Sequence, residues 1–208
     1  MTYWQRWHDD YADPRSDLSQ RLAVVQAAIR SDLDSRPPGP IPLLSMCAGQ
    51  GHDVAGALDG HPRRADVRGL LVELDPSNVA AARTRLHGLR VDAVEGDAGS
   101  TSPYEGAVPA DLLLVCGVFG NVPDEDVERT VALLPTLSAP NATVIWTRHR
   151  REPDLTPSIR GWFSGAGYAE QQYVSPGEGG FAVGVHRLTA EPPPYEPGRR
   201  LFTFVPNG

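Results

Sequence analysis

The chain of 208 residues carries 26 Asp and Glu against 19 Lys and Arg, which gives a formal net charge of −7. This length suits one domain with a full hydrophobic core, and an apolar fraction of 40% argues against disorder throughout. All of the basic residues are arginines. The sequence therefore excludes a Schiff-base lysine, a pyridoxal-phosphate enzyme and a P-loop, whose motif ends in Lys-Ser/Thr.

Helical and strand patterns alternate along the chain. An apolar stripe at spacings of three and four predicts an amphipathic helix over residues 16–34, and the proline-rich run 35–40 ends it. Strands are predicted at 43–46, 67–74, 90–94, 111–116 and 142–148, with helices from about residue 52, over 76–86, over 123–137 and over 156–164. Pro135 predicts an early end or a kink in the third of these helices. A final pair of strands is predicted at 168–174 and 181–187, and residues 201–205 are a candidate edge strand.

This alternation implies right-handed crossovers and a mostly parallel sheet, an α/β fold. Ligands of such sheets bind at the carboxyl ends of the strands, so functional residues are expected just after residues 46, 74, 94 and 116. Three parts are expected along the chain: an N-terminal helical extension over 1–40, a ligand-binding domain over 41–190, and a proline-rich tail over 191–208.

Charge and composition also limit the partners. An acidic chain repels a phosphate backbone, so nucleic acid is disfavoured. Two cysteines cannot build a four-cysteine zinc site, and no paired histidine spacing indicates a metal. No signal peptide is recognisable, and the longest apolar run, residues 112–119, is too short to cross a bilayer. We expect a soluble, cytoplasmic protein with no membrane contact.

Four short segments at the predicted strand ends carry the chemistry. A turn of small residues, Cys47-Ala48-Gly49-Gln50-Gly51, lets backbone amides approach a ligand closely. Glu73 follows Gly51 by 22 residues, a position from which an acid can accept both hydroxyls of a ribose. A carboxylate at Asp97 can accept from an exocyclic adenine amine, and Cys116-Gly117 can offer carbonyls to an ammonium group.

Together these segments resemble class I S-adenosylmethionine-dependent methyltransferases, from about residue 42 to residue 188. The resemblance implies a Rossmann-like three-layer sandwich with a mostly parallel seven-stranded sheet and an antiparallel last strand. It also implies S-adenosylmethionine as cofactor. By position, its methionine part would lie against Cys47, Ala48 and Gly49, its ribose against Glu73, its adenine against Leu74, Asp97 and Ala98, and its amino-acid end against Cys116 and Gly117.

Two positions depart from the family pattern, which usually has an acid and a glycine where this chain has Ser45 and Cys47. Because Cys47 cannot take a positive φ as cheaply as glycine, the turn must either differ slightly or be strained. The main rival cofactor is a nicotinamide dinucleotide. Its fingerprint needs a small residue three positions after Gly51, where this chain has Val54.

Candidates for catalysis are few. His149 follows the fifth strand and is a candidate general base, against the alternative of a solvated histidine in the arginine-rich turn 148–151. Phe119 lies where the family's substrate meets the methyl group, and it either walls that site or belongs to the core. Methyl transfer from a sulfonium does not require a strong base when the acceptor is already deprotonated or soft.

Two further hypotheses concern the edges of the site. Tyr11 and Arg21 precede or begin the N-terminal helix, and we expect them to approach the cofactor, with Arg21 pairing with its carboxylate. Cys47 and Cys116 follow neighbouring strands in the family's order, so one hypothesis is a disulfide switch; the alternative, which cytosolic conditions favour, is a pair of inert buried thiols.

The function predicted is methyl transfer from S-adenosylmethionine to a small-molecule acceptor. The alternatives are a non-catalytic S-adenosylmethionine-binding protein and a nicotinamide-dependent oxidoreductase. A homodimer is possible, joined through the exposed tail strand at 201–205.

Overall fold

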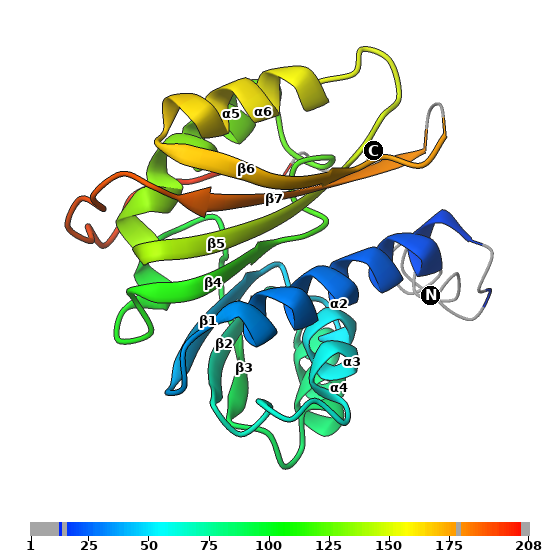
Figure 1. Ribbon diagram of the computed structural model, residues 1–208, viewed down its shortest axis with the longest axis vertical. Helices are drawn as coiled ribbons and strands as arrows, with labels where there is room; N and C mark the ends of the chain where they lie inside the picture. The colour runs from blue at the N-terminus through cyan, green and yellow to red at the C-terminus, as the bar shows by residue number, and fades with distance from the viewer. Residues whose placement is uncertain (1–12, 14–15, 178–179, 205–208) are drawn as a thin grey trace.

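The computed structural model describes residues 13, 16–177 and 180–204 (Figure 1). Helices and strands alternate as predicted, with boundaries that shift by a few residues. The strands are β1 (Ile41–Met46), β2 (Val67–Glu73), β3 (Val91–Glu95), β4 (Ala110–Val115), β5 (Ser138–His149), β6 (Tyr168–Val174) and β7 (Phe181–Leu188). The helices are α2 (Asp17–Ser35), α3 (His52–Leu58), α4 (Pro76–Arg85), α5 (Asp124–Leu133) and α6 (Thr156–Gly165).

The strands form one seven-stranded sheet in the order β3-β2-β1-β4-β5-β7-β6. Neighbouring strands from β3 to β5 pair in parallel, whereas β7 runs antiparallel to both β5 and β6. The strand order reverses between β1 and β4, where ligands of open α/β sheets bind. The predicted Rossmann-like sandwich with an antiparallel last strand is confirmed.

Two hydrophobic layers cover the two faces of the sheet, because successive side chains of a strand point to opposite sides. Along β4, Leu113 and Val115 belong to one buried cluster, while Leu112 and Leu114 belong to the other. The first cluster is completed by α5 and α6, and the second by α2, α3 and α4. This alternation accounts for the apolar run of β4 from Leu112 to Val115, which is typical of a strand covered on both faces.

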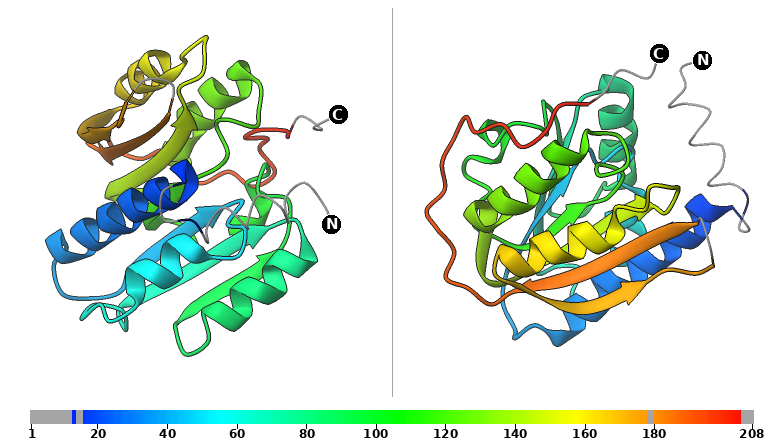
Figure 2. Two further views of the ribbon diagram at one scale, coloured as in Figure 1. Left: turned by 90° about the vertical axis from the view of Figure 1, so that its right-hand side faces the viewer. Right: turned by 90° about the horizontal axis from the view of Figure 1, so that it is seen from above.

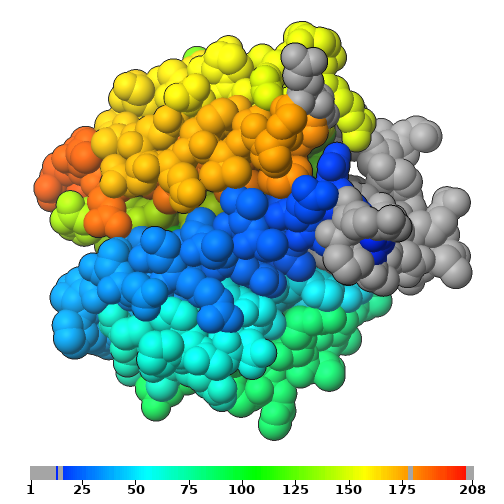
Figure 3. Space-filling model, turned by 45° about the vertical axis from the view of Figure 1, so that its right-hand side comes forward, coloured from blue at the N-terminus to red at the C-terminus, as the bar shows by residue number. Residues whose placement is uncertain are grey.

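Helix α2 is an integral part of the second layer. Ser16 caps its start by accepting a hydrogen bond from Ser19 N at 3.0 Å. Val25, Ile29 and Leu33 are completely or almost completely buried. Figure 3 shows α2 as a band lying across the molecule between the β6–β7 pair and α3, and it packs against both α3 and β7. The predicted division at residue 40 remains a prediction.

The connection between β3 and β4 contains only one turn of 3₁₀ helix, Ser102–Tyr104. The C-terminal strap, which we define as residues 195–204, packs against this connection. After β7 the chain runs around the outside of the molecule and returns beside α5 (Figure 2). Leu201 and Phe202 are buried in the cluster that also contains Tyr104. The strap therefore covers apolar surface that the short β3–β4 connection leaves open.

The expectation of an exposed edge strand at the tail is wrong for residues 201–204. Residues 201–204 form no strand. In the described part of the tail, a single backbone bridge joins Arg200 to Ser100. Because Leu201 and Phe202 face the protein's own core, they are not free to join two subunits. Among the described residues, no helix is both long enough and apolar enough to cross a membrane.

Candidate functional site

The turn after β1 keeps the backbone of a glycine turn although its first glycine is replaced. Cys47 has a φ of +50°, and Gly49 and Gly51 also have positive φ, at +53° and +72°. The strained alternative for Cys47 is thus the one that the structure adopts. Gly51 is the N-cap of α3, and its positive φ favours glycine; a Cβ there would also lie close to Leu71 Cδ2, at 3.2 Å.

Glu73 ends β2 and is held between the first turn and the start of α4. Its Oε2 accepts from Gly49 N at 2.8 Å and its Oε1 from Asp75 N at 2.9 Å. Each carboxylate oxygen retains a further lone pair, so Glu73 can still accept from a diol. Leu74, directly after it, is 68% exposed and is the one large hydrophobic residue exposed in the described part of the chain. An apolar ring stacked on Leu74 would remove that surface from water.

Asp97 lies after β3, close to the same turn. Its Oδ1 accepts from Gly99 N at 2.9 Å, and its Oδ2 forms an ion pair of 2.6 Å with Arg200 of the strap. Burial raises the pKa of the Cys47 thiol well above its usual range, and the nearby carboxylates of Glu73 and Asp97 raise it further. The structure therefore brings Cys47, Glu73 and Asp97 together, as the sequence predicts.

A second group of charges lies beyond β4. Burial raises the pKa of Cys116 well above its usual range; Asp53 raises it further, whereas Arg21 lowers it. Burial likewise raises the pKa of Asp53, opposed by Arg21. These effects indicate that Arg21 of α2 and Asp53 of α3 lie near Cys116, which follows β4. Arg21 thus lies near Asp53 and Cys116, but its approach to the cofactor stays a prediction, and Tyr11 lies outside the described residues.

Two side chains missed in the sequence anchor the segment after β4. Gly117 N donates to Thr147 Oγ1 at 2.9 Å, and Gly117 O accepts from Asn121 Nδ2 at 2.7 Å. The Gly117 carbonyl, expected to face an ammonium group, is therefore already partly engaged. Asp53 was also missed, because a charged residue at the start of a helix is usually solvated and only the fold shows that it approaches Cys116.

The two cysteines follow neighbouring strands but face different layers. The register pairs Ser45 with Leu114, which places Cys47 level with Cys116. Cys47 packs against the cluster completed by α5 and α6, and Cys116 against the one completed by α2 to α4. Both are free, and burial holds both thiols in the protonated state. The structure supports inert packing over the disulfide switch.

The loop after β4 is held by Arg148, at the end of β5. The arginine-rich turn is not simply solvated, since Arg148 is buried, donates to Phe119 O and pairs with Asp124 at 3.3 Å. Phe119 is completely buried, with its ring centroid 6.0 Å from that of Trp146. In this structure Phe119 therefore belongs to the core and does not present a substrate-facing wall.

His149 lies against the same loop, and a Cβ on Gly120 would lie 3.1 Å from His149 Cδ2. Partial burial lowers the pKa of His149, as do Arg148 and Arg151, so the ring is neutral at pH 7. Its Nδ1 accepts from Arg151 N at 3.3 Å, which assigns the proton to Nε2. In that tautomer His149 can donate a hydrogen bond but has no nitrogen free to act as a base.

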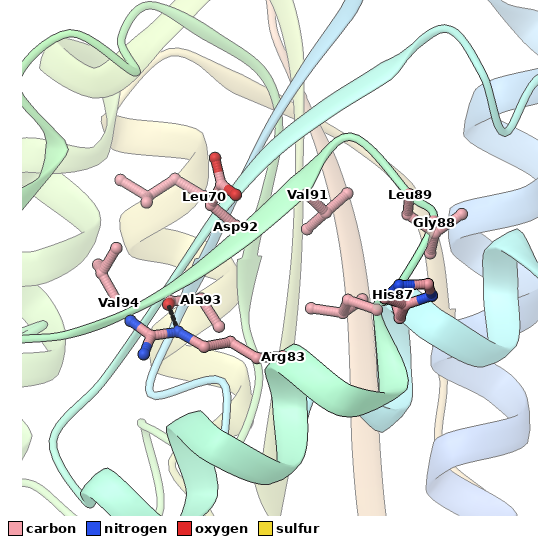
Figure 4. Close-up of a pocket in the computed structure, with 10 residues that line it drawn as sticks. Leu70, Arg83, His87, Gly88, Leu89, Val91, Asp92, Ala93 and Val94 are labelled. Atoms are coloured by element: carbon pink, nitrogen blue, oxygen red, sulfur yellow. Dashed lines mark hydrogen bonds between the residues drawn. The ribbon is translucent and has the colours of Figure 1, made fainter.

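A hollow of about 480 Å³ lies elsewhere, between α4 and the edge strand β3 (Figure 4). It is lined by residues of α4, of β3 and of the turn between them, together with Leu70 of β2, and Arg83 Nε donates to Ala93 O at 2.8 Å beside it. None of the predicted site residues lines this hollow. The candidate site is therefore the carboxyl edge of the sheet.

No protein-family model and no curated protein sequence matches the chain. Solved structures do match. An O-methyltransferase family protein from Burkholderia thailandensis aligns with a TM-score of 0.64 at 20% identity, over 83% of this chain and 57% of that one. Magnesium protoporphyrin IX methyltransferase from Synechocystis PCC 6803, solved with bound S-adenosylmethionine, aligns with a TM-score of 0.69 at 12% identity, over 90% and 91% of the two chains. A methyltransferase of calicheamicin biosynthesis, solved with S-adenosylhomocysteine, aligns with a TM-score of 0.55 at 16% identity.

This chain has the class I methyltransferase fold. It spans 57% of the first of these neighbours, so that protein carries substantial further structure. The resemblance places the cofactor at one edge of the sheet within this fold. Glu73 ends a strand at that edge, and the turn 47–51, Asp97 and Gly117 follow strands there. The sequence did not indicate that Arg200 pairs with Asp97 at this edge.

Proposed function

We propose that this protein transfers a methyl group from S-adenosylmethionine to a small-molecule acceptor. The observation that carries the proposal is the convergence of two carboxylates, Glu73 and Asp97, on the turn that contains Cys47, next to the exposed side chain of Leu74. A nucleoside presents a diol, an exocyclic amine and an apolar ring face, and these residues offer a matching partner for each.

The residues present fit the cofactor at each of its parts. Glu73 has acceptor capacity left for a ribose diol, and Leu74 offers an apolar surface for adenine. The backbone of the turn 47–51 begins helix α3, whose positive end favours a carboxylate. Arg21 supplies a cation near the end of β4 for the carboxylate of the amino-acid end, and Asp53 lies near it. Solved neighbours contain S-adenosylmethionine or S-adenosylhomocysteine, which supports the same choice.

S-adenosylmethionine supplies an electrophilic methyl group on a sulfonium, which an acceptor takes by in-line displacement. The contribution of the chain is orientation and exclusion of water, which can account for much of the rate of such a displacement. Arg148 holds the loop after β4 against α5 through Phe119 O and Asp124. Because His149 is neutral with its proton on Nε2, it can orient an acceptor by donating a hydrogen bond. An acceptor that is already anionic or soft suits this site best.

Replacement of Glu73 tests the cofactor site. We expect Glu73→Gln to weaken S-adenosylhomocysteine binding about tenfold or more, because the substitution removes a charge-assisted hydrogen bond to the ribose. Isothermal titration calorimetry measures the dissociation constant. Asp92→Asn is the matched control, since it removes a carboxylate from the neighbouring strand at the hollow of Figure 4, away from the site. An unchanged constant in Glu73→Gln would contradict the proposed ribose contact.

Turnover separates the proposed enzyme from its alternatives. Release of S-adenosylhomocysteine in the presence of one member of a metabolite panel is expected, and binding without release would identify a non-catalytic binding protein. A thermal shift with NAD but not with S-adenosylmethionine would identify the nicotinamide-dependent alternative. The structure offers that alternative little support, because Val54 is buried where a dinucleotide fingerprint has a small residue.

A further inference from the structure

The C-terminal strap is fastened to the loop after β3 through Thr101, which is completely buried. Thr101 N donates to Arg199 O at 2.9 Å, and its Oγ1 donates to Glu196 O at 2.7 Å. The same Oγ1 accepts from Arg199 N at 2.9 Å, and Thr101 O accepts from the Tyr195 hydroxyl at 2.8 Å. Every polar group of this threonine thus forms a hydrogen bond with the strap, so the loop and the strap are fixed relative to each other.

Arg200, which follows Arg199 in the strap, extends its side chain to the candidate site. Arg200 Nη1 lies 2.6 Å from Asp97 Oδ2, while Gly99 N donates to the other oxygen at 2.9 Å. Leu201 N donates to Gly99 O at 2.8 Å, and Ser100 forms a backbone bridge with Arg200. The loop after β3 and the strap are therefore held together next to the ion pair. Because the Arg200 and Asp97 side chains are about half exposed, the pair adds little to stability. Its consequence is geometric: the Asp97 carboxylate is fixed at both oxygens.

The contact is specific to Arg200 among the arginines of the strap. Arg199 directs its guanidinium to Glu196, within the strap itself, and both side chains are exposed. Phe202 O approaches so closely that a Cβ on Gly99 would lie 2.3 Å from it, and Arg200 Nη1 also donates to Phe202 O at 3.3 Å. The strap thus anchors Arg200 by its own backbone and directs the guanidinium at the loop.

We propose that Arg200 is a positioning residue for nucleobase recognition, acting through Asp97; this rests on the proposed function. With one lone pair of each Asp97 oxygen already used, the remaining acceptor directions are fixed relative to the loop. A fixed carboxylate accepts from the 6-amino group of adenine and repels the 6-oxo group of hypoxanthine at the same place. Loss of Arg200 frees the carboxylate to rotate and thereby reduces the discrimination between amino and oxo groups.

The test measures the dissociation constants of S-adenosylhomocysteine and S-inosylhomocysteine on the full chain by isothermal titration calorimetry. Arg200→Ala is expected to weaken the adenosyl ligand about fivefold and to leave the inosyl ligand within about twofold. Arg200→Lys should retain part of the discrimination, because it keeps a cation at the carboxylate. Arg199→Ala is the matched control and should change neither constant. Thermal unfolding of each variant checks that the strap remains folded.

Three results would overturn the inference. Equal weakening of both ligands would reduce Arg200 to a structural role, an unchanged adenosyl constant would exclude any role, and tighter adenosyl binding would mean that Arg200 competes with the amine. Failure of the proposed function is distinguishable, because it shows as absent binding of S-adenosylhomocysteine to the unsubstituted protein, before any variant is compared.

Discussion

At the scale of single residues, Cys47 shows that a degenerate motif can keep its backbone. The sequence lacks the glycine that usually stands at this position, yet the residue adopts a left-handed φ of +50°. The surrounding turn determines that conformation: Ala48 N is bound to Val72 O at 3.1 Å, and Gly51 N to Ala48 O at 3.0 Å. For a residue with a Cβ, this left-handed conformation costs about 1–2 kcal/mol.

This strain predicts an inverted order of two substitutions. Both Cys47→Gly and Cys47→Ala remove the thiol, but only glycine relieves the left-handed backbone. We expect the free energy of unfolding of Cys47→Gly to exceed that of Cys47→Ala by about 1 kcal/mol, against the usual order in which alanine is the more stable. Urea denaturation of the two variants measures the difference. A more stable alanine variant would show that Cys47 is not strained.

At the scale of elements, a buried network anchors the end of α2 to the sheet. The Asp32 carboxylate accepts from Arg36 Nε at 2.6 Å and from Thr143 Oγ1 of β5 at 2.6 Å. Arg36 also pairs with Asp111, next to the first residue of β4, at 3.4 Å. Sequence periodicity predicted this helix and its apolar face. The network joins residues more than 100 positions apart, so no local pattern could indicate it.

Loss of the Asp32 charge should release this anchor. Asp32→Asn leaves the largely buried guanidinium of Arg36 without its closest counter-ion, and we expect a loss of about 3 kcal/mol in the free energy of unfolding. Thr143→Val removes one hydrogen bond and keeps the ion pair, so its expected loss is about 1 kcal/mol. Chemical denaturation compares the two variants, and equal losses would contradict the importance of the ion pair.

At the scale of the whole molecule, a histidine buried in the hydrophobic layer that contains α5 and α6 imposes an acid limit on stability. His186 of β7 is buried, stacks on Phe163 at a centroid distance of 4.4 Å and accepts from Trp146 Nε1 at 3.1 Å. Burial lowers the pKa of His186 to about 4, which outweighs the opposing effect of Glu170. The folded protein therefore binds the proton more weakly than the unfolded chain does.

The sign of this shift predicts loss of stability in acid. The contribution of His186 is fully present above about pH 6.5 and is lost as the pH falls towards 4, by at most about 3 kcal/mol. His186→Asn keeps an acceptor for Trp146 but cannot titrate, so its stability should fall less steeply between pH 6.5 and 4. Denaturation midpoints at a series of pH values test this, and identical slopes for both proteins would refute it.

The sequence by itself determined the alternation of strands and helices, the short helix α5 and the acids at the ends of β2 and β3. Pro135 correctly predicted the early end of α5 at Leu133, after which one turn of 3₁₀ helix runs over Leu134–Leu137. These features depend on local periodicity and on backbone restrictions of proline and glycine, which can be read from neighbouring residues.

Only the tertiary structure decided which residues meet across the fold. The pairing of Arg200 with Asp97, the approach of Arg21 to Asp53, the separation of the two cysteines and the burial of Leu201 and Phe202 in the core all join distant segments. The sequence predicted an exposed edge strand over residues 201–205 of the tail. In the structure the tail instead packs on the core. The short connection between β3 and β4 leaves apolar surface exposed, and Leu201 and Phe202 of the tail remove that surface from water.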